Sequence, residues 1–219
     1  MIITYGGVEQ VRVQFGDTTI AFNPVSKDSK HKAGSFGSDI VLVSLSHPDM
    51  NGVEQASRAR PNGSSGRNDK QSFSVTGPGE YEIDGVFIKG IASKSQYAGE
   101  ERINTVYSVN LENMNLCFLG ALSENLSSEA ISAIDGVDIL FVPVGGEGVL
   151  DAASANKVAV SLEPGIIIPI HYGSVGEKDA LKKFLKESGS EEVKPVDKLT
   201  IKKKDLEGKE GEIVVLEAQ

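Results

Sequence analysis

The first half of the chain alternates apolar and polar residues in short runs, a pattern typical of antiparallel strands. Asp84-Gly85 separates two of these runs and favours a tight hairpin turn. A second hairpin is predicted where residues 104–111 are followed at once by residues 114–119. The other predicted strands of this half are residues 8–15, 18–22, 39–44, 71–75, 80–83 and 86–91.

The second half alternates apolar runs with amphipathic stretches, which predicts strands separated by helices. Ser127 or Ser128 and, further on, Asp151 are residues typical of helix N-caps. Hairpins followed by alternating strands and helices favour two sheets packed face to face with helices outside, an α/β (α+β) fold with four αββα layers. The predicted helices are residues 51–59, 127–134, 151–162 and 177–187, and the predicted strands are residues 137–142, 166–170, 199–203 and 212–216, with one more near Val193.

Two of the predicted strands end in a proline and a histidine. His47 and Asp49 flank Pro48 just after the strand at 39–44, and His171 follows the apolar run at 166–170. Proline ends a strand ladder because it has no N–H to donate. Open α/β sheets usually keep their chemistry just past such strand ends. If both strands end at the same edge of a sheet, their histidines lie close together, and a metal site is the first hypothesis.

Composition narrows the class of protein. The 219 residues suit one sizeable core, and we expect a single domain over residues 1–219. The net charge of −9 argues against a nucleic-acid partner. Cys117 is the one cysteine, so no intrachain disulfide forms, and no apolar run is long enough for a signal peptide or a membrane span. We therefore expect a cytoplasmic protein without a membrane partner.

Several motifs together resemble the metallo-β-lactamase superfamily, specifically its ascorbate-phosphate-lactonase-like branch of predicted Zn-dependent hydrolases. The resemblance spans nearly the whole chain and implies the same four-layer αββα sandwich. The motifs that carry it are Ile3-Thr4-Tyr5-Gly6, Phe22-Asn23-Pro24, Gly77-Pro78-Gly79-Glu80-Tyr81-Glu82-Ile83, Phe118-Leu119-Gly120, Val142-Pro143-Val144-Gly145-Gly146 and Ile168-Pro169-Ile170-His171-Tyr172.

The resemblance also implies a ligand set for two metals, most of which this chain lacks. The family signature His-x-His-x-Asp-His falls on residues 45–50, and a later His-Leu-Gly-Asp run falls on residues 118–121. Of the ligands for one metal, this chain retains His47. Of the ligands for the other, it retains Asp49 and the later His171. A catalytic zinc normally has three protein ligands, so neither position is complete. The ligand positions replaced by apolar residues are Leu45, Met50, Phe118 and Ala121.

Two hypotheses of function follow. In the first, apolar packing has closed the site, and the chain is a catalytically degenerate scaffold or binding protein without a cofactor. In the second, His47, Asp49 and His171 hold one zinc, manganese or iron ion, and the chain hydrolyses a lactone, ester or phosphoester. Asp49 has the alternative role of capping the helix that follows it. We expect a small-molecule or protein partner and leave the oligomeric state open, while His31 is expected to be exposed.

Overall fold

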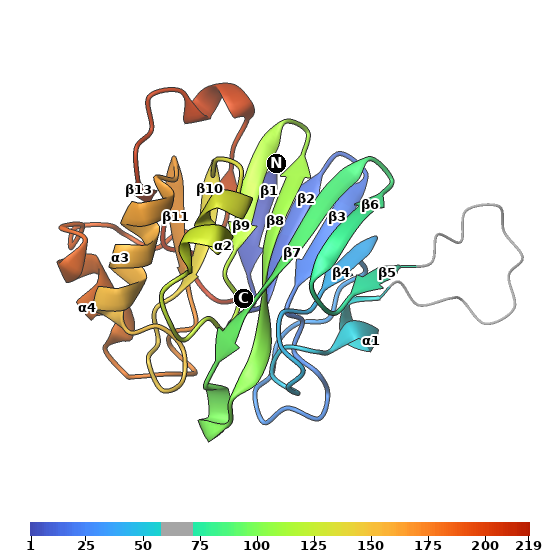
Figure 1. Cartoon of the computed structure of the whole chain (residues 1–219), viewed down its shortest axis with the longest axis horizontal. Helices are drawn as coiled ribbons and strands as arrows, with labels where there is room; N and C mark the ends of the chain where they lie inside the picture. Colours follow the sequence, from blue (N-terminus) through green and yellow to red (C-terminus); the bar gives the residue numbers. More distant parts are fainter. Residues whose placement is uncertain (58–71) are drawn as a thin grey trace, which may run out of the picture.

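The computed structural model describes residues 1–57 and 72–219, which form two mixed sheets packed face to face (Figure 1). The order of the first sheet in these residues is β12-β1-β2-β3-β4-β5, and that of the second is β13-β11-β10-β9-β8-β7-β6. The first sheet comprises β1 (Ile2–Tyr5), β2 (Val11–Phe15), β3 (Thr18–Phe22), β4 (Ile40–Leu42), β5 (Phe73–Val75) and β12 (Leu199–Thr200). The second comprises β6 (Gly79–Ile83), β7 (Val86–Ser95), β8 (Arg102–Leu111), β9 (Met114–Phe118), β10 (Ile139–Pro143), β11 (Ile166–Ile170) and β13 (Glu212–Ile213).

The hairpins predicted from sequence are confirmed. Strands β6 and β7 pair antiparallel, and φ is 51° at Asp84 and 81° at Gly85 in the turn between them. Strands β8 and β9 also pair antiparallel, and both turn residues, Glu112 and Asn113, have positive φ. Two consecutive positive φ values give the turn a twist that matches the right-handed twist of the strands.

Helices α2 (Ser128–Ala133), α3 (Ala152–Leu162) and α4 (Ala180–Glu187) cover the outer face of the second sheet (Figure 1). The Ser127 hydroxyl accepts the N–H of Ala130, and the Asp151 carboxylate accepts that of Ser154, so both predicted caps form. Strands β9, β10 and β11 run parallel beneath these helices and are nearly all buried. The long apolar runs of this half predict strands that are buried on both faces, and β9, β10 and β11 are such strands.

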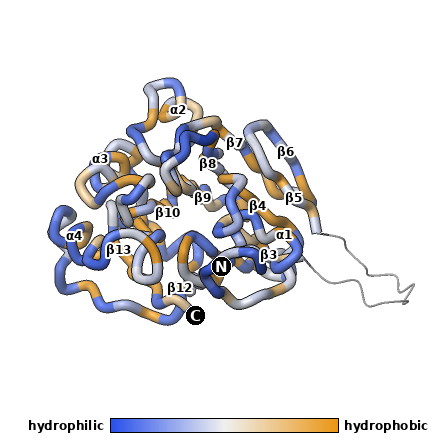
Figure 2. Tube along the Cα trace, turned by 90° about the horizontal axis from the view of Figure 1, so that it is seen from below, coloured by the Kyte–Doolittle hydropathy of each residue, from blue (hydrophilic) through white to orange (hydrophobic). Residues whose placement is uncertain are grey.

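The outer layer of the first sheet is thin. It contains the four-residue helix α1 (Val53–Ala56), which packs with Phe36 over Val41 and its neighbours on the outer face of β3 and β4. The main core lies between the sheets, and Figure 2 shows hydrophobic segments along the strands, β4 among them. The αββα sandwich is thus confirmed. No helix in the described ranges has both the length and the apolar character to cross a membrane.

Several boundaries differ from the prediction. Strand β2 begins at Val11 rather than at residue 8, because Gly7 and Val8 have positive φ and the N–H of Gln10 closes a turn on the carbonyl of Gly7. The strand predicted at 199–203 is shortened to β12, after which the 3₁₀ helix η2 (Lys203–Leu206) begins. The end of the helix predicted at 51–59 and the start of the strand predicted at 71–75 lie outside the described residues.

Candidate functional site

The chain leaves β4 in a compact turn that carries His47 and Asp49. The N–H of His47 bonds to the carbonyl of Leu45, and the N–H of Met50 bonds to the carbonyl of His47. The N-cap of α1 is Gly52, and no side chain of the described residues caps this helix. The alternative role of Asp49 as a helix cap is therefore wrong, and its carboxylate is directed to other partners.

Those partners surround the Asp49 carboxylate, which is 4% exposed. Its Oδ1 accepts the Ser29 hydroxyl at 2.5 Å, and its Oδ2 accepts the Tyr97 hydroxyl at 2.7 Å. The imidazoles of His47 and His31 lie 3.5 Å and 3.9 Å from the same Oδ2. Burial alone would raise the pKa of Asp49, but the two hydroxyl donors and the nearby imidazoles outweigh it, so the pKa lies below its ordinary value. The expectation that His31 is exposed is wrong, since its side chain is only 16% exposed beside this carboxylate.

Tyr97 connects the two histidines predicted to be site residues. It begins the 3₁₀ helix η1 (Tyr97–Gly99) at the tip between β7 and β8. Its ring packs edge-on against His47, with centroids 5.0 Å apart, and against His171, with centroids 5.3 Å apart. Burial, and then its bond to Asp49, raise the pKa of Tyr97, so the hydroxyl stays protonated and donates. Nothing in the local sequence around Tyr97 indicated this position.

His171 lies at the end of β11 with a φ of 60° and is fully buried. Its Nδ1 is 2.8 Å from Oε1 of Glu9, a carboxylate that is itself fully buried. Oε2 of Glu9 accepts the Asn23 amide at 2.7 Å, and Oδ1 of Asn23 accepts the N–H of Ser44. Nε2 of His171 is buried and has no hydrogen-bond partner in the described structure. Glu9 was not predicted as a site residue, because a lone glutamate in an alternating segment carries no signal of burial.

Three of the four replaced ligand positions lie together. Leu45, Met50 and Ala121 form one buried cluster with Tyr97 and Val149. The fourth, Phe118, lies instead in the main core, where its ring stacks on Phe22 with centroids 4.8 Å apart. Leu45, Met50 and Ala121 thus share one cluster, whereas Phe118 belongs to the core between the sheets, and a cleft lined by all four stays a prediction.

The side chains present do not fit the dinuclear centre that the resemblance implied. Nδ1 of His47 accepts the N–H of Asp49, both oxygens of Asp49 accept hydroxyls, and Nδ1 of His171 pairs with Glu9. The ring of Tyr97 contacts both imidazoles. Among residues 1–57 and 72–219, no three or more His, Cys, Asp or Glu side chains are grouped in a way that could hold a metal ion. The four replaced positions contribute only apolar side chains.

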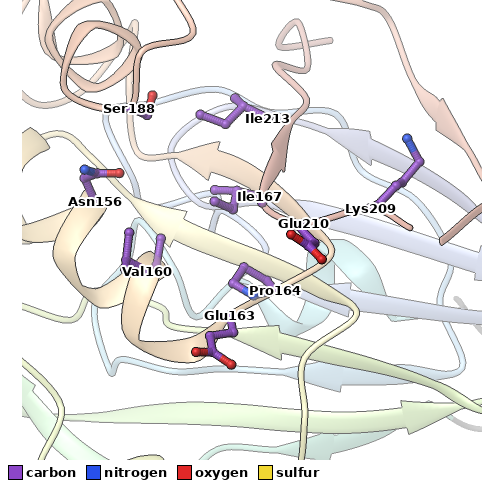
Figure 3. Close-up of a pocket in the computed structure, with 11 residues that line it drawn as sticks. Asn156, Val160, Glu163, Pro164, Ile167, Ser188, Lys209, Glu210 and Ile213 are labelled. Atoms are coloured by element: carbon purple, nitrogen blue, oxygen red, sulfur yellow. The ribbon is translucent and has the colours of Figure 1, made fainter. Parts of the chain in front are cut away.

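A pocket of about 650 Å³ lies elsewhere, between the end of α3, β11 and β13 (Figure 3). Val160, Pro164, Ile167 and Ile213 form its apolar lining, and Glu163, Glu210 and Lys209 are its charged residues. It shares no residue with the group around Asp49, so it does not extend that site.

Comparison with known proteins gives consistent matches. A model of the beta-lactamase superfamily domain matches residues 2–171. A UPF0173 metal-dependent hydrolase of Thermoplasma acidophilum is 25% identical over 172 residues, which cover 72% of this chain and 75% of that protein. A crystal structure from Thermotoga maritima, described as a candidate Zn-dependent hydrolase of the metallo-β-lactamase superfamily, gives a TM-score of 0.77 at 26% identity and covers 100% of this chain and 99% of that one. The structure of a candidate metal-dependent hydrolase from Parabacteroides distasonis gives a TM-score of 0.64 at 17% identity and covers 99% of this chain and 93% of that one. At this identity the likeness shows the fold alone.

Proposed function

The chain belongs to the metallo-β-lactamase superfamily, and we propose that within it this protein is a non-hydrolytic member, a scaffold or binding protein with a closed metal site. The buried cluster of Leu45, Met50, Ala121, Val149 and Tyr97 carries the proposal. Leu45, Met50 and Ala121 place apolar groups at ligand positions that the family resemblance implies, and Val149 and the phenol of Tyr97 pack against them. The net charge of −9 favours a small molecule or a protein as the partner over a nucleic acid.

Energetics support this proposal. Buried imidazoles and carboxylates without a metal are costly unless each is hydrogen-bonded. Asp49 has two hydroxyl donors, and Glu9 has both the amide of Asn23 and the imidazole of His171. The carboxylates of Asp49 and Glu9 thus have protein partners in place of a metal, and Leu45, Met50 and Ala121 pack as core residues do.

A second candidate function, a hydrolase that uses a single ion, is favoured by one observation. Among the described residues, Nε2 of His171 is buried without a hydrogen-bond partner, and an unpaired buried nitrogen is costly unless something binds it. Relatives described as metal-dependent hydrolases point to the same chemistry. For this candidate, Tyr97 must leave its place between the imidazoles, and Asp49 must exchange a hydroxyl donor for the ion.

A melting series separates the two candidates. The chain is melted with EDTA, with zinc and with manganese, alongside Asp49→Ala and His171→Ala. A closed site predicts that the three melting temperatures of the unmutated chain agree. A single bound ion predicts a stabilisation of about 2.7 kcal/mol at a hundredfold excess over its dissociation constant, lost in both variants. Glu187→Ala, which removes an exposed carboxylate from α4, is the matched control and should behave as the unmutated chain does.

A further inference from the structure

The tip between β7 and β8 is anchored by one side chain. Within residues 96–101, Tyr97 is buried and the other five residues are exposed. The backbone contributes a 3.2 Å bond from the N–H of Gln96 to the carbonyl of Gly148, and Arg102 donates to the carbonyl of Tyr97. A segment with so few buried contacts belongs to the part of a protein that opens at low free-energy cost.

The surroundings of Tyr97 combine apolar side chains with a few polar groups. Apolar side chains line its ring, His47 and His171 meet it edge-on, and a buried carboxylate accepts its hydroxyl. Ligand sites combine a mostly apolar lining with a few placed polar groups in this way. Tyr97 leaves one polar atom unsatisfied, since Nε2 of His171 has no partner in the described structure. The Tyr97 side chain therefore fills this space but does not form a hydrogen bond with every polar group that lines it.

We propose that Tyr97 is an exchangeable plug, and that the space it fills is a binding site for phenols, in which the ligand hydroxyl donates to Asp49. This inference names the ligand class of the site treated above and rests on the proposed function, because a bound ion would claim the same carboxylate. In the free protein, the conformation in which Tyr97 has left this space is a minor one. A ligand that binds there makes that conformation the dominant one.

The first experiment removes the plug. Tyr97→Ala, kept in EDTA, is titrated with p-cresol, the side chain of tyrosine as a free molecule, and with toluene, which lacks the hydroxyl. We expect p-cresol to bind at least about tenfold more tightly than toluene, because a hydrogen bond to a buried carboxylate is among the stronger kinds. Tyr97→Ala/Asp49→Ala should lose this preference. Tyr81→Ala, which removes a partly buried tyrosine of β6, should bind neither compound.

The second experiment uses the chain with Tyr97 in place and needs no cavity-forming variant. The five tyrosines are replaced biosynthetically by 3-fluorotyrosine, and Tyr97→Phe identifies the ¹⁹F resonance of Tyr97. Saturating p-cresol should move this resonance to the position of a solvent-exposed tyrosine, and toluene should move it less. An unchanged Tyr97 resonance at p-cresol concentrations that saturate Tyr97→Ala overturns the exchange.

Equal affinity of Tyr97→Ala for p-cresol and toluene overturns the site. A Tyr97→Ala chain that does not fold leaves the decision to the ¹⁹F experiment. If the proposed function fails, the failure is seen as a metal-dependent shift of the melting temperature. The titrations are made in EDTA, so their outcome does not depend on that shift.

Discussion

The hydroxyl of Tyr97 lies 2.7 Å from Oδ2 of Asp49, although the two residues are 48 positions apart and follow strands of different sheets. Tyr97 comes from the tip of the β7–β8 hairpin, and Asp49 from the turn after β4. The bond therefore joins the two sheets at the place where the family signature has its metal ligands.

Removing this hydroxyl should destabilise the chain in a pH-dependent way. Tyr97→Phe leaves Oδ2 of Asp49 without its donor, and we expect a loss of about 1–3 kcal/mol in the free energy of unfolding at pH 7. The pKa of Asp49 is lowered in the folded state, so its stabilisation is complete above the unfolded pKa of about 3.9 and is lost as the pH falls through the folded value. The difference between Tyr97→Phe and the unmutated chain should thus shrink toward pH 3.

Urea unfolding at pH 7, 5 and 3 measures this difference. Tyr81→Phe is the control, because the Tyr81 hydroxyl donates to backbone carbonyls and not to a carboxylate. Its effect should be constant across the series. A Tyr97→Phe effect that is equally constant would contradict the role assigned to Asp49.

Protein purified without chelator should contain well below one equivalent of zinc, manganese or iron per chain. The reason is that Leu45, Met50 and Ala121 contribute apolar side chains to the cluster around Tyr97. Elemental analysis by mass spectrometry gives the number directly. Two equivalents of a divalent metal would refute the closed site altogether.

Restoring the family ligands should cost stability when metal is absent. The combined variant Leu45→His, Met50→His, Phe118→His and Ala121→Asp replaces four buried side chains with polar groups. Phe118→His should contribute most, at about 3–5 kcal/mol, because Phe118 stacks on Phe22 in the main core. Thermal melting in EDTA is the measurement. Ile103→His, at a position 70% exposed, is the control and should change stability by less than about 0.5 kcal/mol. A combined variant as stable as the unmutated chain would mean that the cluster does not pack as a core.

The two site histidines should differ in their contribution to stability. His171→Ala leaves the buried carboxylate of Glu9 without its imidazole partner, and we expect a loss of about 3–5 kcal/mol. His47→Ala removes a side chain that is 20% exposed, and about 1 kcal/mol is expected. Chemical denaturation of both variants, with Glu9→Gln and Glu9→Gln/His171→Ala to complete a double-mutant cycle, isolates the coupling. Additive effects of Glu9→Gln and His171→Ala would show that the pair is not coupled.

Local sequence predicted the hairpins well because their signals are local. Asp84-Gly85 specifies its own turn, and the caps Ser127 and Asp151 act within one helical turn. Strand β2 was placed too early because alternation through Val8 does not reveal that the residue has positive φ. The sandwich itself was predicted from the order of elements and from the family motifs taken together.

The site was predicted only in part, because its contacts join residues far apart in the sequence. His47 and Asp49 are neighbours in the chain and also in the structure. Glu9 pairs with His171 across 162 positions, and a single sequence holds no information about such a pairing. Tyr97 was missed for the same reason, since its role depends on a hairpin tip folding back over the turn after β4.

The last strands complete both sheets. Strand β12 pairs with β1 at the edge of the first sheet, and β13 pairs with β11 at the edge of the second. During synthesis, both edges therefore stay open until the segment from residue 199 to residue 213 has left the ribosome. Open edges pair readily with strands of other chains, so we expect a chain that lacks this segment to aggregate more readily than the whole one.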